Sequence, residues 1–435
     1  MTLRLAPIAV SLCLCAPSLV PDAAHGAEAL PSQAGKITEA AEALRPKVVE
    51  LRRDFHRHPE LAYHEERTAR VVAERLRALG FDEVRTNVAR HGVVALLKGA
   101  RPGPVVAVRA DLDALPISET NNLPYKSAVP GVMHACGHDA HTAIALGVAE
   151  VLSQIRGQLP GAVKFLFQPA EEAGPAHEPD GAALMIREGA LEHPRPLAIF
   201  ALHTAPELDA GTIGYHAGPA QAAIETFALT IRGKVPYGAT PQLGVDTIVV
   251  AAECVSALQT IKSRRIDPFE PVLLTIGSIH GGERPFSTPA EVKLQGSVRT
   301  FSEDARNNIE QLMRETLAGI TAAYGATFDL QFSPVTAVVV NDPKLVGESL
   351  PSLRRAAGAA NVVEIPRRMG GEDFSCYGQV VPGFLFRLGS GNKAKGITAD
   401  AHTAAFDIDE DCLVVGVKAM ASLVADFLEQ QAGRH

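Results

Sequence analysis

The residues best suited to chemistry form a cluster of histidines around one cysteine. Between His134 and His141 the chain carries three imidazoles, the thiol of Cys136 and the carboxylate of Asp139. Sulfur and imidazole nitrogen are the donors that zinc and other late divalent metals prefer. An apolar segment with helical character follows at once, so these side chains would lie on a loop or on a first helical turn. The cluster therefore predicts a metal site, although histidines that merely cap or flank the helix are the alternative.

Carboxylates and a further histidine follow two apolar, strand-like runs. The run 163–168 leads into Glu171 and Glu172, and the run 197–202 leads into His203. In α/β proteins, functional residues gather at the carboxyl ends of strands. One carboxylate of such a pair can bind a metal while its neighbour acts as a base. Taken alone, the two glutamates would also fit a solvated acidic loop, and His203 would also fit a satisfied core histidine.

Two more motifs carry residues of the same kinds. His402 lies near the C-terminus, shortly before Phe406. The apolar run 105–110 leads into Asp111 and Asp113. Aspartates in such a place can orient metal-bound histidines through a hydrogen bond to the second ring nitrogen, and a plain turn at the strand end is the alternative.

The elements that must position these residues alternate between helical and strand-like patterns, which indicates an α/β fold. Helices are expected at 37–56, 65–79, 138–155, 245–263, 305–324 and 413–429, and strands at 93–98, 105–110, 163–168, 197–202, 225–231, 272–279, 291–300 and 327–333. From 225 to 333 the order is strand, helix, strand, strand, helix, strand, which is a ferredoxin-like unit. We therefore predict an α/β domain with a central mixed sheet, formed by 36–217 and 335–435, and a ferredoxin-like domain inserted at 218–334.

Composition narrows the class of protein. The 435 residues include 41 Lys or Arg and 49 Asp or Glu, for a net charge of −8, and 46% of the residues are hydrophobic. This acidic balance disfavours nucleic-acid binding, which needs a basic surface. The six cysteines are too few for a disulfide scaffold in a chain of this length.

The N-terminus has the pattern of an export signal. Arg4 precedes an apolar run at 5–20, and the segment 27–29 reads Ala-Glu-Ala, which fits a cleavage site. A transmembrane anchor is the alternative, but the run is shorter than the roughly 20 residues of a span and contains two prolines. We expect a signal peptide at 1–29, a periplasmic or secreted protein, and no membrane association after cleavage.

Taken in order, these segments resemble the M20 metallopeptidase family. The closest likeness is to its amidohydrolase branch, which includes hippurate hydrolases, N-acyl-amino-acid amidohydrolases and auxin-conjugate hydrolases. The resemblance runs from Leu51 to the terminal helix. Its most specific motifs are Cys136-Gly-His138-Asp-Ala-His141, Gln168-Pro-Ala-Glu-Glu172, Gly370-Gly-Glu-Asp373-Phe, and His402 before Phe406-Asp-Ile-Asp. The family's fold, a catalytic α/β domain with a ferredoxin-like lid, is the one expected above.

The resemblance implies a site with two divalent metal ions, zinc first and manganese or nickel as alternatives. Cys136 matches a thiolate ligand that often bridges the two metals. The other matching ligands are His138, Glu172, His203 and His402. Asp113 matches a residue that orients a ligand histidine, and Glu171 matches the general base. Two metals about 3.5–4 Å apart can hold a hydroxide and polarise an amide carbonyl, while the base moves the proton from water to the leaving amine.

The implied reaction is hydrolysis of an N-acyl amino acid or a related small amide, in a chain that pairs as a homodimer through its lid. An exo-dipeptidase or carboxypeptidase of the same family is one alternative, but those enzymes usually place an aspartate where Cys136 stands. A non-catalytic descendant that binds an amide is another, and the retained Glu171 argues against it.

Two lid positions depart from the family pattern. Tyr237 occupies the place of a lid histidine that often reaches the active site of a neighbouring subunit, and Phe286 aligns with a substrate-contacting asparagine. Arg299 is retained and matches a carboxylate-binding arginine. The aromatic residues favour a bulky acyl or aryl group, or a substrate in which one usual polar contact is absent. If neighbouring residues compensate, the substrate is an ordinary N-acyl amino acid. The loop 173–180 is also longer than usual and could reshape the rim of the pocket.

Overall fold

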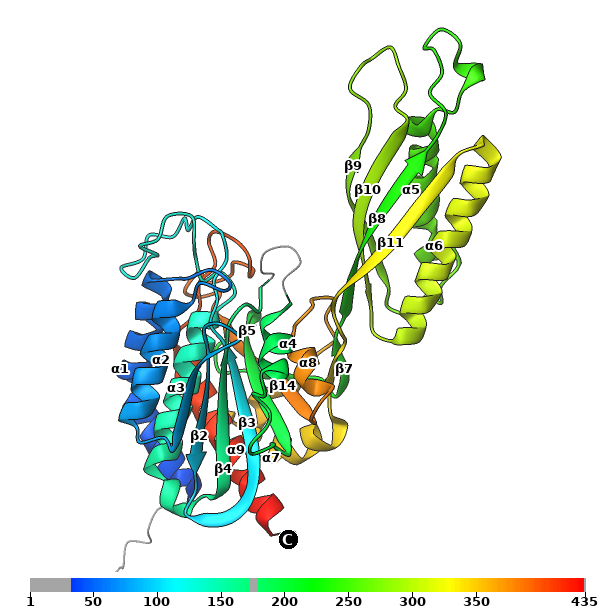
Figure 1. Ribbon diagram of the computed structural model, residues 1–435. Coiled ribbons are helices and arrows are strands. Elements are labelled where there is room, and N and C mark those ends of the chain that lie inside the picture. Colours follow the sequence, from blue (N-terminus) through cyan, green and yellow to red (C-terminus); the bar gives the residue numbers. More distant parts are fainter. Residues whose placement is uncertain (1–32, 173–178, 434–435) are drawn as a thin grey trace, which may run out of the picture.

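The computed structural model describes residues 33–172 and 179–433, which form a large α/β domain and a smaller inserted domain (Figure 1). The expected signal peptide at 1–29 and most of the loop 173–180 lie outside the described residues. Within the described ranges, none of the helices combines the length and apolar character needed to cross a membrane.

The large domain is built on an eight-stranded mixed sheet with the order β1-β2-β4-β3-β5-β14-β6-β13. Its strands are β1 (Glu83–Val88), β2 (Gly92–Lys98), β3 (Arg101–Asp111), β4 (Pro160–Gln168), β5 (Ala198–Asp209), β6 (Ile213–Tyr215), β13 (Val362–Glu364) and β14 (Gly383–Gly391). The strands β4, β3, β5 and β14 run parallel to one another. Their carboxyl ends therefore meet at one edge of the sheet, where the predicted site residues follow them.

Helices cover both faces of this sheet. On one face lie α1 (Gln33–Arg57), α2 (Glu66–Ala78), α3 (His138–Gln154), α7 (Pro343–Ala357) and α9 (Asp411–Ala432). On the other lie α4 (Gly181–Arg187) and α8 (Phe374–Gly378). Side chains alternate along a strand, so Val106 and Val108 pack into the first core while Ala107 packs into the second. Strands buried on both faces explain the long apolar runs in the sequence.

The inserted domain contains a four-stranded antiparallel sheet with the order β11-β8-β10-β9. Its elements are β8 (Ala223–Arg232), α5 (Thr247–Arg264), β9 (Leu273–His280), β10 (Glu291–Thr300), α6 (Glu303–Tyr324) and β11 (Thr327–Thr336). The alternating residues Phe227, Leu229 and Ile231 of β8 pack with the apolar sides of both helices. The predicted α/β fold class with a large mixed sheet is confirmed, and the six elements of the inserted domain occur in the predicted order.

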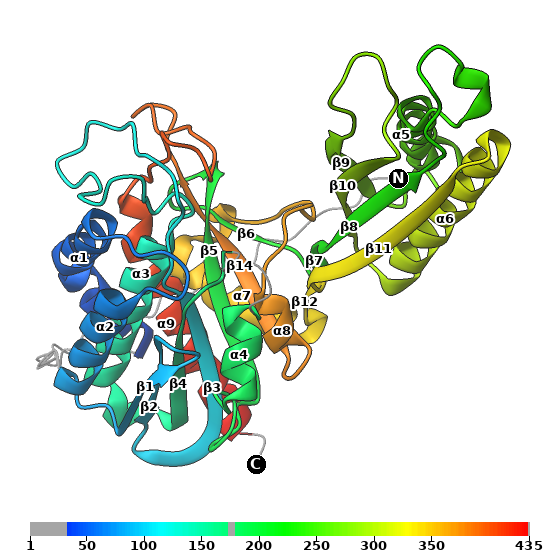
Figure 2. The same ribbon diagram turned by 45° about the horizontal axis from the view of Figure 1, so that its top comes forward.

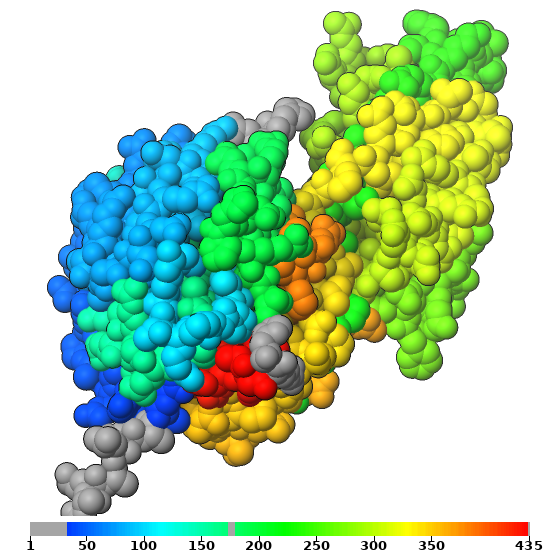
Figure 3. All heavy atoms as spheres, turned by 60° about the horizontal axis from the view of Figure 1, so that its bottom comes forward, coloured from blue at the N-terminus to red at the C-terminus, as the bar shows by residue number. Residues whose placement is uncertain are grey.

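A short two-stranded ribbon joins the two domains. The strands β7 (Gly218–Gln221) and β12 (Val339–Asn341) pair antiparallel where the chain leaves and re-enters the large domain. The inserted domain extends away from this ribbon in two views (Figures 1 and 2), and the space-filling view shows it as a separate yellow-green lobe (Figure 3). Three short 3-10 turns, η1 (Arg156–Gln158), η2 (Pro241–Leu243) and η3 (Ala359–Asn361), complete the described elements.

Candidate metal centre

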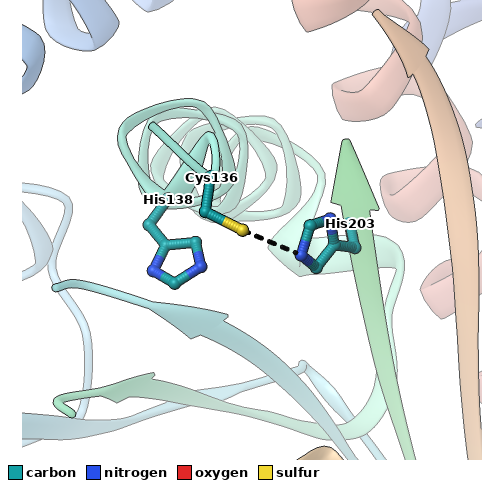
Figure 4. A group of neighbouring side chains, drawn as sticks. All are labelled: Cys136, His138 and His203. Carbon is teal, nitrogen blue, oxygen red and sulfur yellow. Dashed lines mark hydrogen bonds between the residues drawn. The ribbon is translucent and has the colours of Figure 1, made fainter. Parts of the chain in front are cut away.

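Residues from four distant parts of the chain meet at the carboxyl edge of the large sheet. Cys136 lies in the loop just before α3, His138 is the first residue of α3, and His203 comes from β5 (Figure 4). The Cys136 Sγ lies 3.5 Å from the His203 Nε2 and 3.3 Å from the His402 Nε2. The His402 Nε2 lies 3.0 Å from the Glu172 Oε1. The structure therefore gathers all five predicted ligands around one point.

The loop before α3 approaches β5 closely because it contains a glycine. Gly137 has a φ of +91°, a conformation that favours glycine. A Cβ at this position would lie 2.4 Å from the Thr204 Oγ1. That hydroxyl donates a hydrogen bond of 3.0 Å to the Cys136 carbonyl, which fixes the loop on the strand.

His402 has an unusual backbone conformation for a histidine. Its φ is +63°, and its N–H donates to the Ala135 carbonyl at 2.8 Å. Strained backbone of this kind clusters at functional sites, where the surrounding structure holds it in place. The hydrogen bond keeps the imidazole over Cys136.

Hydrogen bonds orient two of the imidazoles so that one nitrogen of each faces the centre. The His138 Nδ1 lies 3.3 Å from the Asp113 Oδ1, and the His203 Nδ1 donates to the Thr204 carbonyl at 2.8 Å. The other oxygen of Asp113 accepts from the Glu172 N–H at 2.9 Å. The His138 Nε2 is buried and has no hydrogen-bond partner in the described part of the chain. A buried nitrogen without a partner is costly unless a metal ion takes its lone pair.

The histidine His141, although part of the same motif, has both ring nitrogens occupied. Its Nδ1 lies 2.6 Å from the Asp111 Oδ1, and its Nε2 accepts from the Thr204 N–H at 2.9 Å. It therefore supports the loop and is not available as a metal ligand.

The donor atoms form two groups of three that share Cys136. One group joins it with His138 and His203, and the other with Glu172 and His402. Burial raises the pKa of the Cys136 thiol to about 12, so the thiol stays protonated at neutral pH unless a bound cation stabilises the thiolate. Sulfur, imidazole and carboxylate donors in this number fit two divalent metal ions with a shared thiolate.

Glu171 lies beside this centre, with its Oε2 3.8 Å from the His138 Nε2. Burial, and then the nearby carboxylate of Glu372, raise the pKa of Glu171 well above its ordinary value. Arg109 holds Glu372 and Asp373 in place, at 3.0 Å and 2.8 Å. A carboxylate with a raised pKa next to a metal centre is suited to general acid and base chemistry.

A cavity of about 400 Å³ opens over the metal centre, between the two domains. Arg299, at the base of the inserted domain, lines this cavity, and its Nη1 donates to the Met369 carbonyl at 2.7 Å. The cavity is also lined by three charged residues that the sequence did not single out as site residues: Arg368, Glu372 and Arg387. The one signal for Arg387 was a charge in the apolar run 383–388.

Tyr237 and Phe286 do not line this cavity. Both are exposed, at 78% and 86%, and border a separate hollow on the inserted domain. Tyr237 follows the end of β8 at Arg232, and Phe286 precedes the start of β10 at Glu291, which pairs with Arg232. Arg299 lies toward the other end of β10, where it pairs with Ile224 near the start of β8. A strand of ten residues is about 30 Å long. Their predicted contact with substrate therefore stays a prediction, and it requires a neighbouring subunit or a large movement of the inserted domain.

The four cysteines in the described residues, Cys136, Cys254, Cys376 and Cys412, are all free thiols. Cys136 is thus available to a metal, and its role as a ligand stays a prediction.

Comparison with known proteins gives the same assignment as the site. The family model for peptidase family M20/M25/M40 matches residues 107–426. N-acetylcysteine deacetylase of Bacillus subtilis (strain 168) is 36% identical over 390 residues, which cover 90% of this chain and 99% of that protein. Thermostable carboxypeptidase 2 of Saccharolobus solfataricus is 35% identical over 393 residues, which cover 90% of this chain and 98% of that protein.

Among solved structures, a dinuclear metal binding peptidase of the M20 family from Bacillus subtilis superposes with a TM-score of 0.76 at 35% identity. The match covers 89% of this chain and 99% of that one. Its description as dinuclear agrees with the two donor groups that share Cys136. The chain therefore belongs to peptidase family M20/M25/M40 and is a hydrolase of that family.

Proposed function

We propose that this protein is a two-metal amidohydrolase that cleaves the amide bond of N-acyl amino acids. The observation that carries the proposal is the position of Glu171, a half-buried carboxyl with a raised pKa, next to donor groups that share Cys136. The similarity to an N-acetylcysteine deacetylase over nearly the whole chain supports the same reaction class.

Each side chain of the site has a role in this reaction. Two bound divalent ions, zinc first and manganese or nickel as alternatives, would supply a Lewis acid for the amide carbonyl and for water. Cys136, His138, Glu172, His203 and His402 would hold these ions.

Glu171 would accept a proton from the attacking water and deliver it to the leaving amine, which is why a raised pKa suits it. Asp113 would keep the His138 Nε2 directed at the centre by holding its Nδ1.

Arg299 is the group proposed to bind the substrate carboxylate. It lines the same cavity as Glu171. Within the described residues, its guanidinium donates one hydrogen bond, to the Met369 carbonyl. An arginine can bind a carboxylate with two parallel hydrogen bonds, which would fix the position of the amide relative to the metals.

Carboxypeptidase activity is the second candidate, because the chain is as similar to a thermostable carboxypeptidase as to the deacetylase. A panel of N-acetylmethionine, N-benzoylglycine and an N-blocked dipeptide, each assayed with metal-loaded protein, separates the two. The amidohydrolase proposal expects the highest kcat/KM for the simple acyl amino acids. Preference for the blocked dipeptide would instead establish a carboxypeptidase, and full metal content with no hydrolysis would establish a binding protein.

The proposal includes a homodimer formed through the inserted domain. The strand β9 forms one edge of the four-stranded sheet, and edge strands are the usual places for a second chain to pair. Leu273 and Ile279 on this strand are exposed, at 42% and 52%. In such a dimer, Tyr237 and Phe286 would be available to the cavity of the other subunit and would favour a bulky acyl group. We further propose export by the segment 1–29 to the periplasm or the medium.

A further inference from the structure

Arg387 is a buried cation next to the metal centre. It lies in β14, and the register of the sheet pairs it directly with His203 on the neighbouring parallel strand β5. Paired residues on adjacent strands project to the same face of a sheet. The guanidinium therefore lies on the same side as the ligand imidazole, where Arg387 is 7% exposed and lines the cavity.

The guanidinium of Arg387 is not satisfied by the protein. Its Nη2 donates to the Thr204 carbonyl at 2.7 Å. Its Nε is buried and has no hydrogen-bond partner in the part of the chain that the structure describes. Burial lowers its pKa to about 10, so it remains charged at neutral pH. A buried charge with an unused N–H is costly, and the ligand that best matches an arginine is a carboxylate.

The cations around the cavity differ in how they are paired. Arg368 forms an ion pair with Glu207. Arg299 and Arg387 each donate to a backbone carbonyl instead. Both guanidiniums are thus held in place by neutral groups, and both line one cavity of about 400 Å³. They can therefore bind two anionic groups of one molecule.

Extending the amidohydrolase function proposed above, we propose that Arg387 binds a second carboxylate of the substrate. Arg299 would take the carboxylate next to the scissile amide, and Arg387 would take the other. The preferred substrates would then be N-acyl amino acids with two anionic groups. The second carboxylate can belong to the amino acid, as in an N-acylaspartate or N-acylglutamate, or to the acyl group, as in an N-succinyl amino acid.

The test compares substrates that differ in one charge. The pairs are N-acetylaspartate with N-acetylasparagine, N-acetylglutamate with N-acetylglutamine, and N-succinyl-leucine with N-butanoyl-leucine. Metal-loaded wild-type protein should favour the doubly charged member of at least one pair by about 10- to 100-fold in kcat/KM, as expected for a hydrogen bond between charged groups. The pair that shows the preference identifies which end of the substrate carries the second carboxylate.

The variant Arg387→Gln keeps a donor for the Thr204 carbonyl but removes the charge. It should bring the preferred ratio close to one, because the loss of kcat/KM falls mainly on the doubly charged member of the pair. Arg387→Lys should restore part of the ratio. Arg195→Gln, an exposed arginine whose Nη2 contacts the Val380 carbonyl, is the control and should leave every ratio unchanged.

Calorimetry separates this proposal from the proposed function. Titration of the same pairs into metal-loaded Glu171→Gln protein, with and without Arg387→Gln, measures binding without turnover. One result would refute the proposed function but leave the Arg387 assignment standing. In it, the wild-type protein hydrolyses no amide, yet binding still favours the doubly charged molecule and this preference depends on Arg387. A wild-type protein without charge preference in binding or turnover overturns the assignment. So does an Arg387→Gln variant that loses metal or loses all substrates equally, because Arg387 would then serve the Cys136 thiolate.

Discussion

At the scale of single residues, Cys136 determines what the site can hold. Its sulfur lies within 3.5 Å of the nitrogens of His203 and His402, which are far apart in the sequence. Both groups of donor atoms share it. Because burial raises the pKa of the free thiol to about 12, metal binding must displace a proton from the sulfur.

Removing this sulfur should therefore remove metal. We expect Cys136→Ala to fall from about two metal ions per chain to fewer than one after dialysis, measured by elemental analysis. Cys254→Ala, a change in the core of the inserted domain, is the matched control and should keep both ions. Two ions retained by Cys136→Ala would show that the thiolate is not a ligand.

The candidate ligands could be named from the sequence because they lie in motifs that resemble those of a known family, whereas Arg387 and Glu372 could not be placed in the cavity. The position of Arg387 depends on the register between β14 and β5, which are far apart in the chain. The position of Glu372 depends on its contact with Arg109. Glu372 lies within the motif Gly370-Gly-Glu-Asp373-Phe, and Arg387 interrupts an apolar run, but neither pattern indicates which contact the side chain makes.

At the scale of elements, the loop after β4 has to hold two adjacent glutamates in different directions. Ala170 in this loop has a φ of +50°, and its N–H donates to the Glu65 Oε1 at 2.8 Å. The same oxygen accepts from the Tyr63 N–H at 3.0 Å. Glu65, just before α2, thus ties the loop after β4 to a different element. Burial raises its pKa to about 8.

This raised pKa gives a stability change with a defined sign. Unfolded Glu65 ionises above about pH 4.3, whereas folded Glu65 keeps its proton up to about pH 8. Between these values unfolding releases a proton, so the free energy of unfolding should fall as the pH rises, by at most about 1.4 kcal/mol per pH unit. Above pH 8 this contribution should be constant.

Glu65→Gln should lack this slope, because the amide resembles the protonated acid and cannot ionise. Denaturant unfolding at pH 5 and pH 8 should show the variant gaining stability relative to the wild-type protein at the higher pH. The exposed neighbour Glu66→Gln serves as the control. If the free energy of unfolding changed equally with pH in Glu65→Gln and in the wild-type protein, Glu65 would not be protonated in the folded state.

Most long elements could be predicted from periodicity, and the predicted helices end within a few residues of the observed ones. The elements that the sequence did not predict are β1, β6, β7, β12, β13, β14, α4, α7 and α8. Most of these are short, so they offer too few residues for a period to show. The strand β14 is longer, but Arg387, which lines the cavity, interrupts its apolar run.

At the scale of the whole molecule, the two domains meet over the cavity through a narrow ribbon. Arg299 reaches the cavity from the inserted domain, while the candidate metal ligands belong to the large domain. Tyr237 and Phe286 lie at the other end of the inserted domain. A complete substrate site that uses all of these residues therefore requires a second subunit or domain movement.

The proposed dimer through β9 can be tested by adding a charge to its edge. Ile279→Lys should convert a wild-type dimer to a monomer in light scattering at micromolar concentration, because the exposed apolar side chain would be covered in the pair. Phe269→Lys, an equally drastic change at a residue 92% exposed outside the strand, should leave the mass unchanged. A wild-type protein of monomeric mass would exclude the dimer.

The central claim is that Glu171 acts as the base beside a two-metal centre. The variants Glu171→Gln and Glu172→Gln change neighbouring residues. Metal content and turnover of N-acetylmethionine, measured on both variants, should distinguish them. Glu171→Gln should keep about two metal ions per chain and lose activity by about 10²- to 10⁴-fold, whereas Glu172→Gln should lose metal as well. Turnover close to wild type in Glu171→Gln, or loss of metal from that variant, would contradict the account.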